Sequence, residues 1–260
     1  MPWVVAALAV ASGVLFKVDF ETAPAGPYTP AAMNADFHYP AWSDGIDEGR
    51  AAIVSAPGRC GQALRVDYPA GRVGEGVIIP VALARHDALY LAFDVYFPEG
   101  FVFVKEGKLL GLCGGACNSG GKKPDGRDGW SSRVIWRGDR AAQYLYWPGQ
   151  ADIYGDIAPW RDARLTTGAW HHVETYVRVN HPGQADGVSE SWLDGRRVYL
   201  NRHIRWRDMA DVAIDSFRFE TFFGGGTPDF APPADQYALF DNIAVSTRRR
   251  HHPAANVSDC

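Results

Sequence analysis

The strongest constraint on the fold is a series of short segments in which apolar and polar side chains alternate, or in which β-branched and aromatic residues accumulate. These strand-like segments cover residues 14–21, 63–68, 76–81, 88–97, 170–180, 189–193, 213–223 and 238–246. Successive side chains of a strand point to opposite faces, so the pattern predicts strands with one buried face. Turn-forming residues separate several of the segments, as in Pro98-Glu-Gly100 and Asp194-Gly195. The sequence therefore predicts an all-β chain.

Helical periodicity is weak, and no repeat typical of a solenoid or propeller is present. Residues 205–212 are expected to form one short helix or a loop, and residues 118–128 a mobile loop over a cleft. A chain of 260 residues can bury a substantial core, and all-β sandwiches of about 200–250 residues commonly form one domain. We expect a single-domain β-jelly roll, a two-sheet antiparallel sandwich in which one concave sheet forms a substrate cleft.

The composition narrows the class of ligand. Aromatic residues make up 13% of the chain and include nine Trp, more than a core usually requires, and aromatic faces are common platforms for sugar rings. The net charge of −4, with no basic stripe apart from residues 248–252, argues against nucleic acid. An acidic polymer would then have to be attracted by a local cluster of cations. We expect a monomer without membrane insertion.

The two ends of the chain are expected to lie outside the domain, which we place at residues 14–246. Residues 4–11 are apolar and are followed by small residues, as in a secretory signal, although no Lys or Arg precedes them. The alternative is an apolar leader, residues 1–13, that packs or frays. We expect a secreted or extracellular protein, or a virus-associated one, and a disordered basic tail over residues 247–260.

The middle third carries two neighbouring runs with a distinctive polar face. In residues 130–137, Ser131, Arg133 and Arg137 share one side of a strand, while Val and Trp residues take the other. In residues 143–147, Tyr144 and Tyr146 point one way while Leu and Trp point the other. Two antiparallel strands would therefore bury an apolar face and present Ser, Arg and Tyr on an open face.

These residue types suit an acidic sugar. Cleavage of a uronic-acid polysaccharide by β-elimination requires neutralisation of the C5 carboxylate, removal of the C5 proton and protonation of the O4 leaving group. Arg133 can bind the carboxylate through two hydrogen bonds and stabilise the charge that develops there. A tyrosine can act as base or acid, but its usual pKa of about 10 must be lowered for the base role. Lys108 and Arg133 are expected to provide that lowering.

At these residues the sequence resembles polysaccharide lyase family 14, the alginate and glucuronate lyases that include enzymes from molluscs and algal viruses. The family's lysine segment, Ser-x-Arg and Tyr-x-Tyr are matched by Gly107-Lys108-Leu-Leu-Gly111-Leu112, by Ser131 and Arg133, and by Tyr144 and Tyr146. Further similarity at residues 168–171, 179–180, 192–195, 221–225 and 240–243 extends the resemblance over roughly residues 15–246. Two positions depart from the pattern, Leu110 in place of proline and Cys113 in place of an aromatic residue.

The resemblance implies a concanavalin A-like jelly roll and a lyase. We expect that the elimination needs no cofactor, because Arg and Lys offset the charge of the carboxylate. It implies a catalytic set in which Arg133 neutralises the carboxylate, Tyr144 and Tyr146 transfer protons, and Lys108 and Ser131 stabilise charge and orient the sugar. Which tyrosine is base and which is acid stays open. So do the uronic acid preferred and the choice between internal and terminal cleavage.

Further residues are candidates for substrate binding. In residues 170–178, alternation places His172, Glu174 and Tyr176 on one face of a strand, where they would extend the groove or form a solvated outer face. Arg137 and Glu220 are second-rank candidates on the same reasoning.

Cysteines and carboxylates leave two structural questions. Cys113 and Cys117 flank a Gly-rich loop and are expected to form a local disulfide in an oxidising environment, a reading we prefer to zinc. The pairing of Cys60 and Cys260 cannot be deduced from spacing. Residues 19–21 and 240–242 would bring carboxylates together if the terminal strands pair, which suggests a structural calcium site or ordinary capping of strand ends.

Two other functional classes remain open. A glycoside hydrolase on the same fold would need two carboxylates that flank the cleaved bond, and Glu174 and Glu220 are available for that role. A non-catalytic carbohydrate-binding or adhesion domain could use the same groove without turnover. A lyase alone creates a conjugated double bond that absorbs in the ultraviolet.

Overall fold

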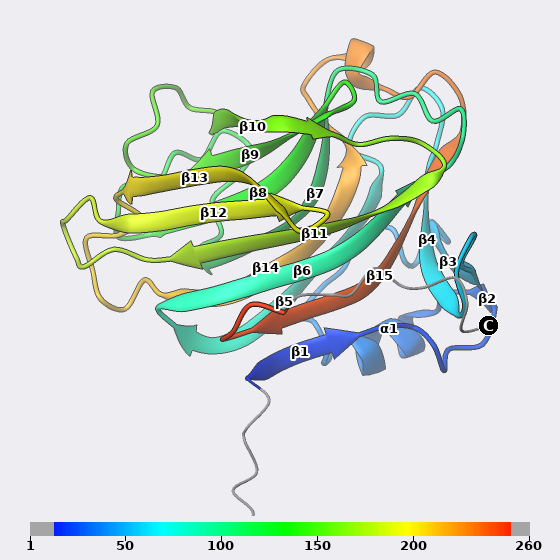
Figure 1. The fold of residues 1–260 in the computed structure, drawn as a ribbon, viewed down its shortest axis with the longest axis horizontal. Coiled ribbons are helices and arrows are strands. Elements are labelled where there is room, and N and C mark those ends of the chain that lie inside the picture. Colours follow the sequence, from blue (N-terminus) through cyan, green and yellow to red (C-terminus); the bar gives the residue numbers. More distant parts are fainter. Residues whose placement is uncertain (1–12, 251–260) are drawn as a thin grey trace, which may run out of the picture.

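The computed structural model describes residues 13–250, in which fifteen strands form two antiparallel sheets that pack face to face (Figure 1). The predicted all-β, two-sheet jelly roll is confirmed. Residues 1–12 and 251–260 lie outside the described part, so the leader and most of the basic tail remain predictions. Within residues 13–250 no helix is long and apolar enough to cross a bilayer.

The larger sheet has nine strands and contains both terminal strands. Its order is β13-β12-β11-β6-β15-β4-β3-β2, and β1 pairs with the second half of β15 while β4 pairs with the first half. In Figure 1, β1 and β15 lie side by side at the lower edge. The strands are β1 (Val14–Val18), β2 (Gly26–Pro27), β3 (Ala51–Ser55), β4 (Gln62–Tyr68), β6 (Ala88–Phe97), β11 (Ala169–Arg178), β12 (Gly187–Leu193), β13 (Arg196–Ile204) and β15 (Gln236–Ser246).

The smaller sheet has six strands in the order β10-β9-β8-β7-β14-β5. Its central strands β7, β8 and β9 come from the middle third of the chain, and β14 joins them from the C-terminal third. The strands are β5 (Gly76–His86), β7 (Gly107–Gly115), β8 (Gly129–Arg137), β9 (Arg140–Tyr146), β10 (Asp156–Arg164) and β14 (Ile214–Phe223). This order places the two polar runs found in the sequence on adjacent strands, β8 and β9, as predicted.

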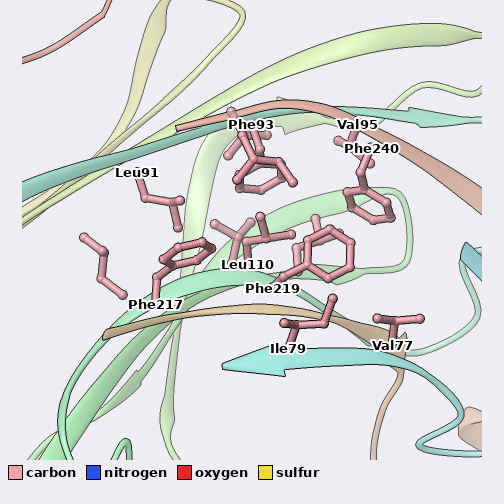
Figure 2. Close-up of a cluster of buried hydrophobic side chains, with 14 of the residues drawn as sticks. Val77, Ile79, Leu91, Phe93, Val95, Leu110, Phe217, Phe219 and Phe240 are labelled. Atoms are coloured by element: carbon pink, nitrogen blue, oxygen red, sulfur yellow. The ribbon is translucent and has the colours of Figure 1, made fainter. Parts of the chain in front are cut away.

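The core fills the space between the sheets with aliphatic and aromatic side chains. Figure 2 shows Leu91, Phe93 and Val95 of β6 facing Phe217 and Phe219 of β14. The Phe219 ring lies 5.1 Å from the ring of Phe240 on β15 and 5.7 Å from that of Phe37. Leu91, Phe93 and Val95 occupy every second position of β6, as Phe217 and Phe219 do on β14, which is the period that the sequence displayed. Burial of these alternate positions holds the two sheets together.

One short helix, α1 (Pro30–Asp36), was not predicted from the sequence. Thr29 caps it by accepting a hydrogen bond from the backbone N–H of Ala32, and proline occupies its first turn. Met33 is its buried residue, so a single apolar position gives no periodic pattern to detect. A second short helical turn, η1 (Pro228–Phe230), follows β14. Residues 205–212 form a loop rather than a helix.

We predict that Phe219→Ala lowers the free energy of unfolding by about 3–5 kcal/mol, because it opens a cavity between the sheets. Leu200→Ala, at a side chain that is 36% exposed, is the matched control and should cost less than about 1 kcal/mol. Chemical denaturation with both variants measures the difference. Equal losses would contradict the assignment of Phe219 to the main core.

Candidate active site

Four adjacent strands, β14, β7, β8 and β9, carry the predicted residues on the face of the smaller sheet that is turned away from the core. Arg133 on β8 is in register with Tyr144 on β9 and with Gly111 on β7. Ser131 is likewise in register with Tyr146. The intervening residues Trp130, Val134 and Trp136 belong to the core between the sheets. The two faces predicted from alternation are therefore confirmed.

The cationic and phenolic side chains meet at one place. The Tyr144 and Tyr146 hydroxyl groups lie 3.3 Å apart. The guanidinium carbon of Arg133 lies 5.1 Å from the ring centroid of Tyr144 and 5.5 Å from that of Tyr146. The Lys108 Nζ atom lies 4.4 Å from the ring centroid of Tyr144. The four side chains therefore form one cluster on the site face.

Arg133 crosses over β7 to reach a carboxylate on β14. Its Nη1 donates a hydrogen bond of 2.5 Å to Oε1 of Glu220, and both side chains are almost fully buried. Gly111 makes the crossing possible, because a Cβ there would lie 2.4 Å from the Ser132 carbonyl oxygen and 2.5 Å from Cγ of Arg133. The Arg133 Nε is buried and has no hydrogen-bond partner in the described part of the chain. Glu220 thus neutralises the guanidinium while one of its donors stays unused.

Lys108 is buried beside Glu106, to whose carboxylate its ammonium group donates a hydrogen bond. Burial lowers the pKa of Lys108, and the charge of Arg133 lowers it further, whereas Glu106 and Glu220 act in the opposite direction. Arg137 lies at the rim, 58% exposed, with its Nε 3.7 Å from Oε2 of Glu106. A lysine in this environment releases its proton more readily than an exposed one.

The expectation that Lys108 and Arg133 depress the pKa of a tyrosine is wrong for Tyr144. Burial raises the pKa of Tyr144 well above its usual value, and the hydrogen bond with Tyr146 raises it further. The opposing effect of Arg133 is smaller than that of burial. Tyr144 therefore keeps its proton at neutral pH.

The predicted open face is covered rather than exposed. Ser131, Arg133 and Tyr146 are each at most 3% exposed, and Tyr144 is 7% exposed. The segment 116–128 forms part of the cover. Ser131 Oγ donates a hydrogen bond to the carbonyl oxygen of Asn118, and the backbone N–H of Gly121 donates one to the Tyr146 hydroxyl. A polymer can contact the Tyr146 hydroxyl only if this segment shifts. The predicted position of the loop over the site is correct.

The two departures from the family pattern have different surroundings. Leu110 is fully buried in the core between the sheets. Cys113 forms the predicted disulfide with Cys117, with the two Cα atoms 4.9 Å apart. Because Cys113 is in register with Ser131, the disulfide fixes the start of the covering segment next to the site.

The structure does not bring His172, Glu174 and Tyr176 to this site, so the prediction that they extend the same groove is wrong. They share one face of β11, as alternation suggested, but β11 belongs to the larger sheet. Val173 and Val177 of that strand fill the core, so the three polar side chains point away from it, on the opposite side of the sandwich. Glu174 there accepts hydrogen bonds from Arg249, which belongs to the predicted basic tail.

A guanidinium pairs with one of the carboxylates that suggested a structural calcium site. Terminal strands β1 and β15 pair as expected, which brings residues 19–21 and 240–242 together. Arg59 bridges Asp94 and Asp241, with N to O distances of 2.7 and 2.6 Å. Burial raises the pKa of Asp241 to about 7. Among residues 13–250 no group of three or more His, Cys, Asp or Glu side chains is arranged to hold a metal ion.

Sequence reasoning missed two residues that surround the predicted set. Glu106 directly precedes the lysine segment, but nothing in the sequence pattern distinguished it. Arg218 lies two positions before Glu220 on β14, so its place on the site face was available from alternation. Glu220 was named, but its pairing with Arg133 joins residues 87 positions apart and leaves no local signal.

Comparisons with known proteins agree with the fold. The family model for polysaccharide lyase 14 matches residues 59–243, more than half of the chain. A protein named exolysin from Paramecium bursaria Chlorella virus 1 is 26% identical over 192 residues, which is 62% of this chain. The chain spans 29% of the length of that viral relative.

Solved structures are similar over nearly the whole chain. Alginate lyase Aly36B superposes with a TM-score of 0.79 and 25% identity, covering 93% of this chain and 100% of that one. The alginate lyase from the marine mollusc Aplysia kurodai gives a TM-score of 0.75 and 25% identity, covering 90% and 99%.

We predict that Glu220→Ala lowers the free energy of unfolding by about 3–5 kcal/mol, because it leaves the Arg133 guanidinium buried without its partner. The matched control is Asp139→Ala, which removes an ion pair with Arg164 at the surface and should cost about 0–1 kcal/mol. Thermal and chemical unfolding compare the two. A loss for Glu220→Ala no larger than the control would contradict the buried pair.

Proposed function

The chain belongs to the polysaccharide lyase 14 family, and from this premise we propose that it cleaves a uronic-acid polysaccharide by β-elimination. The supporting observation is the convergence of Arg133, Lys108 and two tyrosines on one face of the smaller sheet. The similar proteins named alginate lyases make alginate the first substrate to test, with glucuronan as the second. We place the lyase domain at residues 14–246.

In this proposal Arg133 binds the C5 carboxylate of the sugar that reacts. Removal of the C5 proton moves negative charge onto that carboxylate, and a guanidinium already in place stabilises the charge as it develops. Glu220 holds the guanidinium from the side of β14, and the buried, unpaired Nε donor would become available to a substrate oxygen once the covering segment shifts. Ser131 then anchors the covering segment rather than the sugar, since its hydroxyl donates to Asn118.

The pKa directions suggest how the protons move. Lys108, whose pKa is lowered by burial, accepts the C5 proton in its neutral form. Tyr144, whose pKa is raised by burial, keeps its proton and donates it to O4 as the C4–O4 bond breaks. The electron pair of the C5–H bond forms the C4–C5 double bond, and the C4–O4 pair leaves with O4, which takes the phenol proton. Lys108 ends as an ammonium ion and Tyr144 as a phenolate, so atoms and charges balance. The sequence-based expectation gave both transfers to the tyrosines; here Tyr146 orients Tyr144 through their hydroxyl contact.

The positions of Glu174 and Glu220 do not support the alternative of a glycoside hydrolase that uses this pair. Glu174 lies on the outer face of the larger sheet, and Glu220 lies on the site face of the smaller one. The core separates them, whereas glycoside hydrolysis requires two carboxylates on either side of one bond. A non-catalytic carbohydrate-binding domain is distinguished by the absence of turnover.

Other parts of the proposal follow from the substrate. Uronic-acid polysaccharides of this class are cell-wall and matrix polymers, so we propose that the protein acts outside the cell that makes it, or as a viral component. The described side chains supply every group that the elimination needs, and we propose that it proceeds in a monomer without a cofactor.

We predict that the protein produces unsaturated uronate from at least one of three polymers, alginate, glucuronan or hyaluronan. The product is detected by its ultraviolet absorbance. Arg133→Ala should lower the rate by more than about a hundredfold, as expected for loss of one donor to the developing charge. Arg197→Ala, an exposed arginine of the larger sheet, serves as control and should leave the rate unchanged. New reducing ends without absorbance would indicate a hydrolase and refute the proposal.

The base assignment predicts a defined effect of pH. If neutral Lys108 accepts the proton, the rate rises with pH as Lys108 loses its own proton. The charge of Glu106 raises the pKa of Lys108, so Glu106→Gln should lower that pKa and move the rising limb of the pH–rate profile to lower pH. Glu99→Gln, in an exposed turn, is the control. A rising limb that stays in place or moves to higher pH would exclude Lys108 as the base.

A further inference from the structure

A second arginine lies on the site face with few polar contacts. Arg218 of β14 is in register with Gly111 on β7, which is in register with Arg133 on β8 and, beyond it, Tyr144 on β9. These four positions form one row across four neighbouring strands. Gly111 has no side chain, so nothing from β7 stands between the two arginines in this row.

The guanidinium of Arg218 is weakly held. Its polar contacts within residues 13–250 are a hydrogen bond of 3.5 Å to Ser119 Oγ and an ion pair of 3.6 Å to Oε2 of Glu220, both through Nη1. Distances of this size are at the weak end for hydrogen bonds. A guanidinium has five N–H donors, so most of the donors of Arg218 are available. Its side chain is 18% exposed, in contrast to 4% for Arg133.

An exposed aromatic ring lies next to this arginine. The guanidinium carbon of Arg218 is 6.0 Å from the ring centroid of Trp42, and Trp42 is 47% exposed. Trp42 precedes Asp44, which is bridged to Ile78 on β5, so the ring stands at the β5 side of the row. The accessible ring of Trp42 offers a flat surface on which a sugar can stack, and the guanidinium beside it can pair with the carboxylate of that sugar.

From this row we infer that Arg218 and Trp42 form a second uronate-binding subsite, which holds a sugar of the same polysaccharide chain away from the cleaved bond. The inference rests on the proposed lyase function. Neighbouring strands lie about 4.8 Å apart, so the backbones that carry Arg133 and Arg218 are about 10 Å apart. Every sugar of a polyuronate carries a carboxylate, so a chain that crosses the strands meets Tyr144, Arg133, Arg218 and Trp42 in that order.

This subsite binds the chain without taking part in the elimination. Its contacts are equally strong before and during the reaction, so they affect KM and leave kcat unchanged. Charge also favours a polyanion here, because Glu220 is shared by Arg133 and Arg218 and balances one of the two. The Arg218 subsite therefore selects long acidic chains over short ones.

The test compares Arg218→Gln and Trp42→Ala with a matched control, Arg65→Gln. Arg65 lies 4.1 Å above the ring of Tyr237 beside Asp67, but on the outer face of the larger sheet. We expect each subsite variant to raise KM for polymeric alginate about tenfold, through loss of a charge-assisted contact in Arg218→Gln and of the aromatic surface in Trp42→Ala. The value of kcat should change little, and the control should match the wild type. With oligosaccharides too short to reach both arginines, the increase in KM should vanish.

Retardation in gels that contain alginate gives a second measurement that needs no turnover. Weaker retardation of Arg218→Gln, but not of Arg65→Gln, supports the subsite. Binding of alginate without cleavage would refute only the lyase proposal and would leave this support intact. A lower kcat with unchanged KM would overturn the inference, since Arg218 would then act through Glu220 on Arg133. Unchanged KM and retardation in both subsite variants would also overturn it.

Discussion

The site depends on the ion pair that Arg133 forms with Glu220 across a strand that has no side chain at the crossing point. A buried guanidinium is costly unless its charge is balanced, and Glu220 supplies that balance from β14. Gly111 supplies the space, because any Cβ at that position would overlap the backbone of β8 and the Arg133 side chain. Together they hold the guanidinium on the site face, where the phenols of β9 converge on it.

Burial gives the ionisable groups of the site opposite tendencies. The same loss of solvent lowers the pKa of Lys108 and raises the pKa of Tyr144, because in each case the charged form is disfavoured. Lys108 therefore releases its proton more readily, and Tyr144 is protonated at neutral pH, which are the starting states that the proposed elimination uses. The segment 116–128, held by the Cys113–Cys117 disulfide and by Ser131, covers part of the site and contributes to this burial.

The sequence was sufficient to predict the sandwich and the two faces of β8 and β9, because a period of two residues directly reports which side chains are buried. It was also sufficient to identify the residues that converge, since Lys108, Arg133, Tyr144 and Tyr146 stand in a specific order. It was not sufficient to assign strands to sheets. His172, Glu174 and Tyr176 share a face as expected, but only the pairing of β11 with β6 and β12 shows that this face lies on the far side of the molecule. The pairing of Arg133 with Glu220 likewise arises from a contact between distant segments, and so does the burial of Tyr144. Local sequence patterns do not predict such contacts.

Elimination at this site requires a uronate to bind on the site face of the smaller sheet, with its carboxylate on Arg133. The most direct measurement is a crystal structure of the Lys108→Ala variant, which should not turn over, soaked with an alginate oligosaccharide. The account predicts a carboxylate within hydrogen-bond distance of the Arg133 guanidinium, C4 and O4 next to the Tyr144 hydroxyl, and displacement of the backbone near Gly121. An oligosaccharide bound instead on the outer face of the larger sheet, with the Arg133 site still closed, would contradict it.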